Sequence, residues 1–458
     1  MSFGRVRHVH FVGIGGAGMC GLAELLHGEG LQVSGCDLAA NEATARLQQL
    51  GIPVAIGHDP AHLRATQVLV VSSAIAADNP EVRVARERAI PVIRRAEMLG
   101  EISRLRRCIA VAGTHGKTTT TSLTGFILTE AGLDPTVAVG GRVHFLGAHA
   151  RLGRGPHLVC EADEFDRSFL DLHPMVAVIT CVEAEHLDTY GTVEALEDAF
   201  VAFANRVPFY GAVIANLDDP GVRRLLPRLH RRVVTYGFSP QADVHGRAVA
   251  LTQEGGRCQV VVGGHEVGTL AIRLPGRHMV ANALAALAAA LEVEVDPATA
   301  LAALGAFTGV ARRFERKGQR RGVLVVDDYA HHHTELAATL QGARQAFPTA
   351  RLVAVFQPHL YSRTAAFAAQ LGEALLAADA AVVLPIYPAR EAPIPGITAG
   401  LVVDAARRCG HRHVLYADSF DDALAHLNGL LREGDVLLTL GAGNVVHLGE
   451  RWLAGGHP

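Results

Sequence analysis

Short apolar runs alternate with amphipathic segments along the whole chain, and this alternation predicts its elements. The runs that match buried strands lie at residues 8–14, 67–72, 108–112, 157–160, 176–180, 211–216, 322–326, 351–356, 380–385 and 435–440. Helical patterns fall among them at residues 19–30, 118–132, 279–291 and 334–347. Because strands that alternate with helices build parallel sheets, the pattern predicts an α/β fold with largely parallel sheets.

The length of the chain sets the expected number of domains. At roughly 150 residues per domain, a chain of 458 residues is expected to form about three. The α/β pattern restarts next to two charged segments, at 94–107 and at 312–321. The predicted domains are therefore residues 1–100, 101–310 and 311–458.

Composition and charge exclude several classes of protein. The net charge is −3, from 42 basic and 45 acidic residues, which leaves no basic surface for general nucleic-acid binding. No apolar run reaches the roughly 18 residues of a membrane span, and the first residues lack the apolar stretch of a signal peptide. Seven scattered cysteines without a C-x-x-C pair predict neither a disulfide framework nor a zinc site of that type. We expect a cytoplasmic protein without a nucleic-acid or membrane partner, and its oligomeric state stays open.

Lysine is rare in this chain, whereas arginine is common. Lys117 and Lys317 are the only two lysines among the 42 basic residues. We therefore expect at least one of them to hold a position that arginine cannot fill. Lys317 lies among arginines, and we expect it to be a solvated residue at a domain boundary.

A first glycine-rich motif predicts a ligand that carries a diphosphate. The segment G-I-G-G-A-G at 13–18 follows an apolar run and precedes a helical pattern, and Asp37 comes nineteen residues after Gly18. Such glycines allow a tight turn and close approach to a diphosphate at a helix N-terminus, while the carboxylate accepts hydrogen bonds from a ribose or a base. This motif alone allows NAD or a UDP-sugar, and an ordinary βαβ turn is the structural alternative.

A second motif indicates nucleotide triphosphate binding. The segment G-T-H-G-K-T-T at 113–119 follows the run 108–112 and opens a helical pattern. The backbone N–H groups of such a loop hold phosphates, the ammonium of Lys117 reaches the terminal ones, and the hydroxyl of Thr118 is placed for Mg²⁺. A third segment, G-A-G at 441–443, is expected to be an ordinary turn.

Two acidic segments follow the runs that come after this loop. E-A-D-E at 161–164 follows the run 157–160, and E-A-E-H-L-D at 183–188 follows the run 176–180. Because ligands gather beyond the carboxyl ends of parallel strands, we expect both to face one Mg²⁺–ATP site. Each alone is typical of a solvated acidic loop.

Taken together, these motifs resemble the Mur ligase family, the ATP-dependent amide ligases that build the peptide of bacterial cell-wall precursors. The similar motifs are H-F-V-G-I-G-G-A-G-M at 10–19, G-T-H-G-K-T-T-T-T at 113–121, E-A-D-E at 161–164, H-L-D-T-Y at 186–190, R-R-F at 312–314, D-D-Y-A-H-H at 327–332, F-Q-P-H at 356–359 with S-R-T at 362–364, and L-G-A-G-N at 440–444. They keep the family's order and cover almost the whole chain.

The resemblance implies a UDP-binding Rossmann-like domain, a central P-loop-type ATPase domain and a Rossmann-like C-terminal domain that binds the amino acid. Among the members, the motifs are most similar to those that join L-alanine to UDP-N-acetylmuramate. The implied reaction activates the muramyl carboxylate with ATP and Mg²⁺ as an acyl phosphate, which the amine of L-alanine then attacks.

The resemblance also assigns roles to individual residues. The implied UDP-sugar contacts are Gly13, Gly15, Gly16, Ala17, Gly18, Asp37, Ser72 and Ser73. The implied ATP contacts are Gly113, Thr114, His115, Gly116, Lys117, Thr118, Thr119, His278, Asn282 and Asp328. Tyr329, His331 and Arg363 are implied to bind the amino acid, and Thr118, Glu161 and His186 to hold metal. The implied catalytic residues are Lys117, His186, Arg313, His331 and Arg363.

The chain departs from the family pattern at several of these motifs. Met279 replaces an asparagine, Cys181 an asparagine, Glu185 an aspartate and His333 a proline. Leu360 stands where many alanine-adding members carry arginine, which bears on amino-acid selectivity.

The chain also lacks a lysine that several members of the family carry, and two alternative functions stay open. Several relatives carry a carbamylated lysine beyond the metal histidine, and this chain has no lysine between residues 118 and 316. One alternative is a recycling ligase that attaches a murein tripeptide to UDP-N-acetylmuramate. Another is an NAD-dependent oxidoreductase that uses only the first motif.

Overall fold

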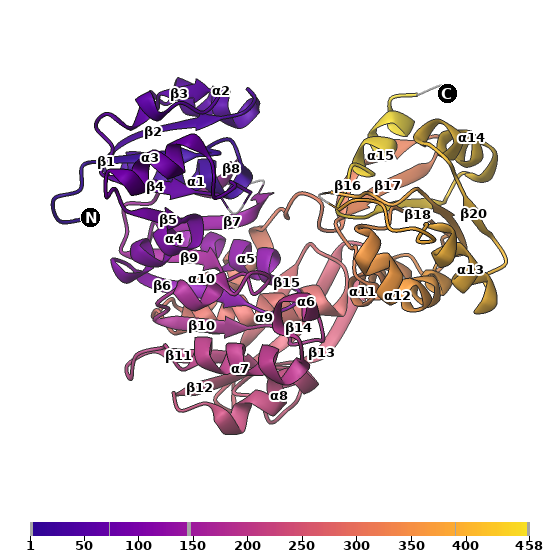
Figure 1. Ribbon diagram of the computed structural model, residues 1–458. Coiled ribbons are helices and arrows are strands. Elements are labelled where there is room, and N and C mark those ends of the chain that lie inside the picture. Colours follow the sequence, from indigo (N-terminus) through magenta and orange to yellow (C-terminus); the bar gives the residue numbers. More distant parts are fainter. Residues whose placement is uncertain (1–2, 73, 144–147, 390, 456–458) are drawn as a thin grey trace. The chain divides into compact units, whose positions relative to one another are not determined.

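The computed structural model describes residues 3–72, 74–143, 148–389 and 391–455, and its strands form three sheets (Figure 1). The chain divides into two compact units. One consists of Met1–Arg247, Gln259–Leu270 and Ala281–Thr308, and the other of Ala248–Cys258, Ala271–Val280 and Gly309–Pro458.

The first sheet is parallel and has the strand order β3-β2-β1-β4-β5. Its elements are β1 His8–Val12, α1 Ala17–Gly28, β2 Gln32–Asp37, α2 Glu42–Gln49, β3 Val54–Ile56, the 3₁₀ turn η1 Pro60–Leu63, β4 Val68–Val71, α3 Pro80–Glu87, β5 Val92–Arg94 and α4 Arg95–Arg104. The order reverses between β1 and β4, so the connections leave β1 and β4 in opposite directions. A crevice for ligands forms at such a point, beyond the carboxyl ends of the strands.

The second sheet has the order β15-β14-β13-β12-β11-β10-β6-β9-β7-β8. Its strands are β6 Arg107–Ala112, β7 Thr136–Val143, β8 Ala148–Arg151, β9 His157–Glu161, β10 Val176–Ile179, β11 Ala212–Asn216, β12 Val233–Gly237, β13 Val244–Thr252, β14 Gly255–Val262 and β15 His265–Ile272. The helices are α5 Lys117–Glu130, α6 Leu187–Tyr190, α7 Val193–Ala204, α8 Pro220–Leu225, α9 Arg277–Leu291 and α10 Pro297–Ala306, with 3₁₀ turns η3 Ser168–Asp171 and η4 Leu226–Arg228. β6 lies between β10 and β9 and is parallel to both, which brings the ends of these three strands together.

The third sheet has the order β16-β17-β21-β18-β19-β20, and only its edge strand β16 is antiparallel. Its elements are β16 Glu315–Arg320, β17 Val323–Asp328, α11 His333–Ala346, β18 Leu352–Phe356, α12 Tyr361–Ala374, η5 Leu375–Ala377, β19 Ala380–Val383, α13 Gly400–Arg408, β20 Val414–Tyr416, α14 Phe420–Leu430, β21 Val436–Leu440 and α15 Val446–Leu453.

Helices cover both faces of the third sheet, because alternate side chains of each strand point to opposite faces. Leu352, Ala354 and Phe356 of β18 pack in the core under α11, α12 and α13. Val353 and Val355 of the same strand pack in the core under α14 and α15. The apolar run at 351–356 is continuous for this reason.

The predicted fold class is confirmed, with strands inside all ten apolar runs and helices at all four helical patterns. The helix predicted at 279–291 is α9, and its residues Ala283–Ala290 are buried. Within the described ranges we find no helix with the length and hydrophobicity needed to cross a membrane. The domain boundaries predicted at residues 100 and 310 stay predictions.

Candidate functional site

The first glycine-rich turn joins β1 to α1 and holds Asp37 against it. The N–H groups of Gly13 and Ile14 donate to the carbonyl of Cys36, and the N–H of Gly15 donates to Asp37 Oδ2 over 2.8 Å. A Cβ on Gly15 would lie 2.9 Å from Asp37 Oδ2, so a larger residue there would displace this carboxylate. The turn therefore places one carboxylate beside the N-terminus of α1, as the motif predicts for a nucleotide-binding strand–turn–helix unit.

The structure describes only some of the other residues predicted to contact the UDP-sugar. Ser72 lies at the end of β4, where its N–H donates to the carbonyl of Val12 and its hydroxyl accepts the N–H of Ala74. Ser73 lies outside the described residues, and Ala17 is described only as the first residue of α1.

Arg95 is a candidate for anion binding that the sequence analysis missed. Its Cδ and Nη1 lie 3.1 Å from where a Cβ on Gly18 would be. Gly18, Arg95, Glu161 and Asp163 are among the residues that line a pocket of about 110 Å³. Arg95 therefore brings positive charge to the N-terminal turn of α1. In the sequence, Arg95 stands out only as one charge of the segment 94–107.

The second glycine-rich loop joins β6 to α5 in the strand–loop–helix order that the motif predicts. Gly116 precedes the first residue of α5 in a left-handed conformation, with φ of 83°. A Cβ there would lie 2.6 Å from Oδ1 of the buried Asn282. The structure therefore brings the predicted ATP-binding residues Gly116 and Asn282 together.

Replacement of Gly116 by alanine is expected to remove nucleotide binding, because the methyl group would push Asn282 away from the loop. The left-handed backbone adds a cost of about 1–2 kcal/mol. Gly132→Ala is the matched control, since Gly132 has φ of 76° but no atom within 4 Å of its Cβ position. Titration with a fluorescent ATP analogue should give binding for Gly132→Ala and none for Gly116→Ala. Equal binding by both variants would contradict this account of the loop.

Lys117 is fixed by a buried carboxylate. Its Nζ donates to both oxygens of Glu164, at 2.9 and 2.8 Å, and to the carbonyl of Gly113 at 2.8 Å. The Glu164 side chain is 1% exposed. Burial alone would lower the pKa of Lys117, but the charges of Glu164 and Asp163 outweigh it and raise that pKa. Lys117 is therefore a full positive charge at the loop that the motif predicts to bind phosphates. Glu164 was predicted only as part of an acidic motif, without this role.

The remaining predicted groups of the central domain gather around this pair. Glu161 ends β9 directly opposite Val111 of β6, next to the loop. His186 Nε2 lies 3.6 Å from Glu164 Oε1, and His115 Nε2 lies 3.4 Å from Glu183 Oε2. Both acidic segments thus follow β9 and β10, the strands on either side of β6, and lie at the same edge of the sheet as the loop.

The third sheet carries the predicted amino-acid-binding residues. The His331 ring lies edge-on to Tyr329 and to His359, with centroids 5.3 and 5.5 Å apart. Arg363 Nη1 lies 3.3 Å from His359 Nδ1. Burial, together with the nearby charges of His331 and Arg363, lowers the pKa of His359 to about 4. His359 is therefore neutral near pH 7, and the guanidinium of Arg363 supplies the positive charge.

Leu360 lies between His359 and Arg363 in a backbone conformation that is unusual for a residue with a side chain. Its φ is 69° and its ψ is 139°. Its N–H donates to the carbonyl of Tyr387, and its own carbonyl accepts the N–H and the hydroxyl of Thr364. Main-chain hydrogen bonds therefore hold this conformation.

The two arginines of the R-R-F motif make different contacts. Arg312 holds a neighbouring turn, whereas Arg313 makes longer contacts with side chains. Arg312 donates to Asp327 Oδ2 and to the carbonyls of the predicted turn at 441–443, which fixes that turn. Arg313 lies over the Tyr329 ring at 5.2 Å, and its Nη1 is 3.9 Å from Glu335. Arg313 therefore remains the candidate for contact with a transferring phosphoryl group.

Asp328 and His278 are the other predicted ATP contacts in this part of the chain. The two carboxylate oxygens of Asp328 accept the N–H groups of Phe314 and Ala330, and burial raises its pKa to about 6, against the effect of Arg313. Burial and the charge of Arg313 lower the pKa of His278 to about 4. Their predicted contacts with the nucleotide stay predictions.

The prediction that Lys317 is solvated was wrong, and its place at a domain boundary stays a prediction. Its side chain lies in β16 and is 20% exposed, and its Nζ is 3.1 Å from Glu450 and 3.4 Å from Glu315. Lys317 is therefore an ion-paired residue of an edge strand. Its carboxylate partner on α15 is distant in sequence, so the charged segment around Lys317 gave no sign of it.

Three family models match the chain in succession. They are the catalytic domain of the Mur ligase family at residues 8–107, the Mur ligase middle domain at 111–290, and the Mur ligase glutamate ligase domain at 312–443. The chain belongs to the Mur ligase family. The resemblance inferred from the motifs is therefore confirmed.

This Mur ligase is similar over its full length to curated relatives. It is 50% identical over 450 residues to the UDP-N-acetylmuramate–L-alanine ligase of Solidesulfovibrio magneticus, covering 98% of each chain. It is 48% identical over 464 residues to the enzyme of the same name from Halorhodospira halophila, covering 99% of this chain and 96% of that one.

Solved structures give the same fold. The UDP-N-acetylmuramate-alanine ligase of Thermotoga maritima superposes with a TM-score of 0.81 at 28% identity, covering 98% of each chain. A murein peptide ligase from Psychrobacter arcticus superposes with a TM-score of 0.69 at 26% identity, also covering 98% of each chain. The three-domain architecture of this Mur ligase is thus that of the family.

Proposed function

We propose that this Mur ligase joins L-alanine to the carboxylate of UDP-N-acetylmuramate at the expense of ATP, in the synthesis of peptidoglycan precursors. The observation that carries the proposal is the 50% identity, over 98% of both chains, to a relative of that name. Family membership leaves an NAD-dependent oxidoreductase without support, because that alternative gives the phosphate-binding loop and its acids no role. Since ATP is a substrate, we place the reaction in the cytoplasm.

The proposed reaction has two steps. A carboxylate oxygen of the muramyl group attacks the γ-phosphorus of ATP, which forms an acyl phosphate and releases ADP. The neutral amine of L-alanine then attacks the acyl carbon, phosphate leaves, and the nitrogen loses a proton as the amide forms. Because two anions must meet in the first step, positive charge has to converge on the transferring group.

Two basic residues of the chain supply that charge, and three other residues are placed to hold Mg²⁺. Lys117 presents a full positive charge at the loop, and we assign Arg313 to the same phosphoryl group. The carboxylate of Glu161 and the hydroxyl of Thr118 offer the oxygen ligands that Mg²⁺ prefers, and we assign a second ion to His186. Bound Mg²⁺ would neutralise charge on the phosphates.

The C-terminal cluster fits the recognition of a free amino acid. We assign the guanidinium of Arg363 to the carboxylate of L-alanine, because its fork matches a carboxylate with two parallel hydrogen bonds. Tyr329 and His331 line the same cluster. Leu360 adds no charge, so Arg363 carries this recognition.

A coupled assay for phosphate release tests the proposal. Full-length protein with Mg-ATP and UDP-N-acetylmuramate is expected to release phosphate only after L-alanine is added. Glycine and L-serine measure selectivity, and the murein tripeptide tests the recycling alternative. Release with the tripeptide and not with L-alanine would assign the chain to recycling. If no amine gave release, the ligase activity would be refuted.

A further inference from the structure

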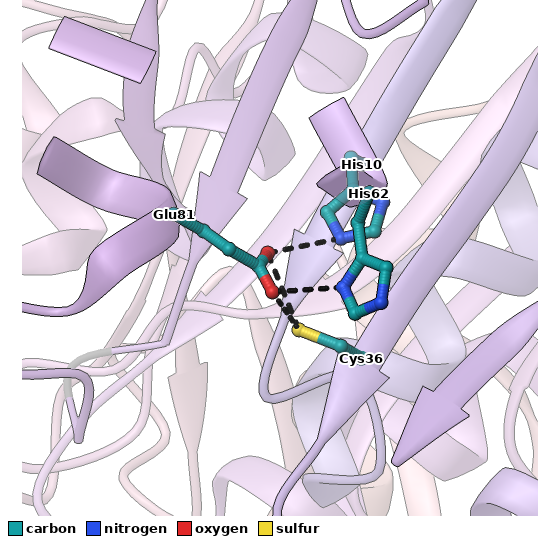
Figure 2. A group of neighbouring side chains, drawn as sticks. All are labelled: His10, Cys36, His62 and Glu81. Atoms are coloured by element: carbon teal, nitrogen blue, oxygen red, sulfur yellow. Dashed lines mark hydrogen bonds and ion pairs between the residues drawn. The ribbon is translucent and has the colours of Figure 1, made fainter. Parts of the chain in front are cut away.

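Four side chains that no predicted role includes meet inside the N-terminal sheet domain. They are His10 on β1, Cys36 on β2, His62 on η1 and Glu81 on α3 (Figure 2). One nitrogen, sulfur or oxygen atom of each lies within 4.8 Å of those of the others. His10, Cys36 and Glu81 are buried, and His62 is partly exposed.

Glu81 is the centre of this His–Cys–His–Glu cluster. Its Oε2 lies 3.2 Å from His10 Nε2, and its Oε1 lies 3.1 Å from Cys36 Sγ and 3.0 Å from His62 Nδ1. The buried carboxylate thus contacts three side chains, each of which can also ligate a metal ion.

The His10 ring is oriented so that one nitrogen points into the cluster. Its Nδ1 lies 2.7 Å from the hydroxyl of Ser34, which fixes the ring. Its Nε2 is buried and lies 3.2 Å from Glu81 Oε2. The contact of Nδ1 with Ser34 therefore leaves Nε2 as the nitrogen that faces the cluster and could bind an ion.

We propose that His10, Cys36, His62 and Glu81 bind one Zn²⁺ ion. Two imidazole nitrogens, a thiolate and a carboxylate form a four-ligand set of the type that zinc prefers, whereas Mg²⁺ and Ca²⁺ prefer oxygen alone. Binding replaces the proton of the Cys36 thiol, which is released to water. Thiolate and carboxylate then balance the two charges of the ion, so the buried site is neutral.

Groups around the cluster complete such a site. Ser34 holds His10, and the N–H of Asp59 donates to Glu81 Oε1 over 3.0 Å. His58 Nδ1 lies 3.2 Å from Cys36 Sγ, where an N–H would stabilise a thiolate. Such outer contacts orient metal ligands. His10 and His62 also line a hollow of about 530 Å³, which gives an ion a path from solvent.

The ion would join four segments that are distant in sequence. It would tie the middle of β1 and the end of β2 to η1 and to the start of α3. Cys36 directly precedes Asp37, so the ion would also fix the strand end that presents Asp37 to the glycine-rich turn. This role is structural and does not depend on the ligase reaction proposed above.

Metal binding by the full-length protein tests the proposal directly. Chelator-treated protein is incubated with Zn²⁺, dialysed, and measured by elemental analysis, which is expected to give one zinc per chain. Co²⁺ in place of Zn²⁺ should give the visible bands of a tetrahedral ion and a thiolate charge-transfer band. Titration against a chromogenic chelator then gives the affinity.

Two ligand variants and one control decide the outcome. Cys36→Ser should lose the charge-transfer band, and His62→Ala, at a partly exposed position, should weaken zinc binding by at least about 100-fold. Cys409→Ser, at an exposed cysteine outside the cluster, should bind like the wild type. Circular dichroism without metal verifies that each variant is folded. Absence of bound zinc in the wild type, or unchanged affinity in either ligand variant, would overturn the proposal.

Discussion

Lys117→Ala is expected to lower kcat by about 10²–10³-fold, because removal of one group that stabilises charge in a transition state typically costs that much. The ammonium is the positive charge closest to the phosphate-binding loop, and no other lysine lies between residues 1 and 316 to replace it. Lys117→Arg is expected to fail as well. A forked guanidinium does not fit where a compact ammonium contacts Glu164 and the carbonyl of Gly113.

The second lysine of the chain provides the matched control. Lys317→Arg keeps the charge that pairs with Glu450 and Glu315, so turnover should be unchanged. Phosphate release by the three variants, measured side by side, checks the prediction. If Lys117→Arg kept the wild-type kcat, the role given to the ammonium would be wrong.

Loss of Lys117 also leaves a buried carboxylate without its cation. Removal of one partner from a buried pair costs roughly 3–5 kcal/mol of folding stability. Lys117→Ala combined with Glu164→Gln should recover most of that loss in a thermal melt, because the amide carries no charge. The double variant should still be inactive, which separates the catalytic effect from the effect on stability.

Arg363→Ala is expected to lower kcat/KM for L-alanine by about 10²–10³-fold, since truncation of a charge that pairs with a buried ionic group costs several kcal/mol. The loss should appear mainly in KM for L-alanine, with KM for ATP almost unchanged. Arg363→Lys should recover part of the activity, because an ammonium keeps the charge but not the fork.

Kinetics with each substrate varied in turn check this assignment. Arg407→Lys is the control, because Arg407 is an exposed residue of α13 and pairs only loosely with Asp404, at 3.9 Å. An equal rise in KM for ATP and for L-alanine in Arg363→Ala would contradict a role specific to the amino acid.

The sequence predicted those parts of the site whose residues are close together along the chain. The turn at 13–18 and the loop at 113–119 each lie between a strand and a helix, and the acids at 161–164 follow the neighbouring strand β9. Fold class could be predicted for the same reason, because continuous apolar runs are a property of strands that helices cover on both faces.

Contacts between distant segments could not be predicted in this way. The pairing of Lys117 with Glu164 depends on the order of β6 and β9 in the sheet, and Arg95 reaches Gly18 only because α4 lies beside α1. The His–Cys–His–Glu cluster is a stronger case, since its members come from four elements with no regular spacing. The absence of a C-x-x-C pair excluded only zinc sites built from nearby cysteines.

The conformation of Leu360 has a consequence for how the amino-acid site can change. A residue with a side chain at this φ and ψ carries a strain of about 1–3 kcal/mol. Hydrogen bonds of the main chain maintain that conformation, and any residue except proline could make them at this position. Residue 360 can therefore be exchanged in evolution, leucine for arginine included, while the backbone that carries Arg363 stays in place. If the proposed amino-acid site is correct, its selectivity can change at residue 360 without a change in the fold, at the cost of some folding stability at that residue.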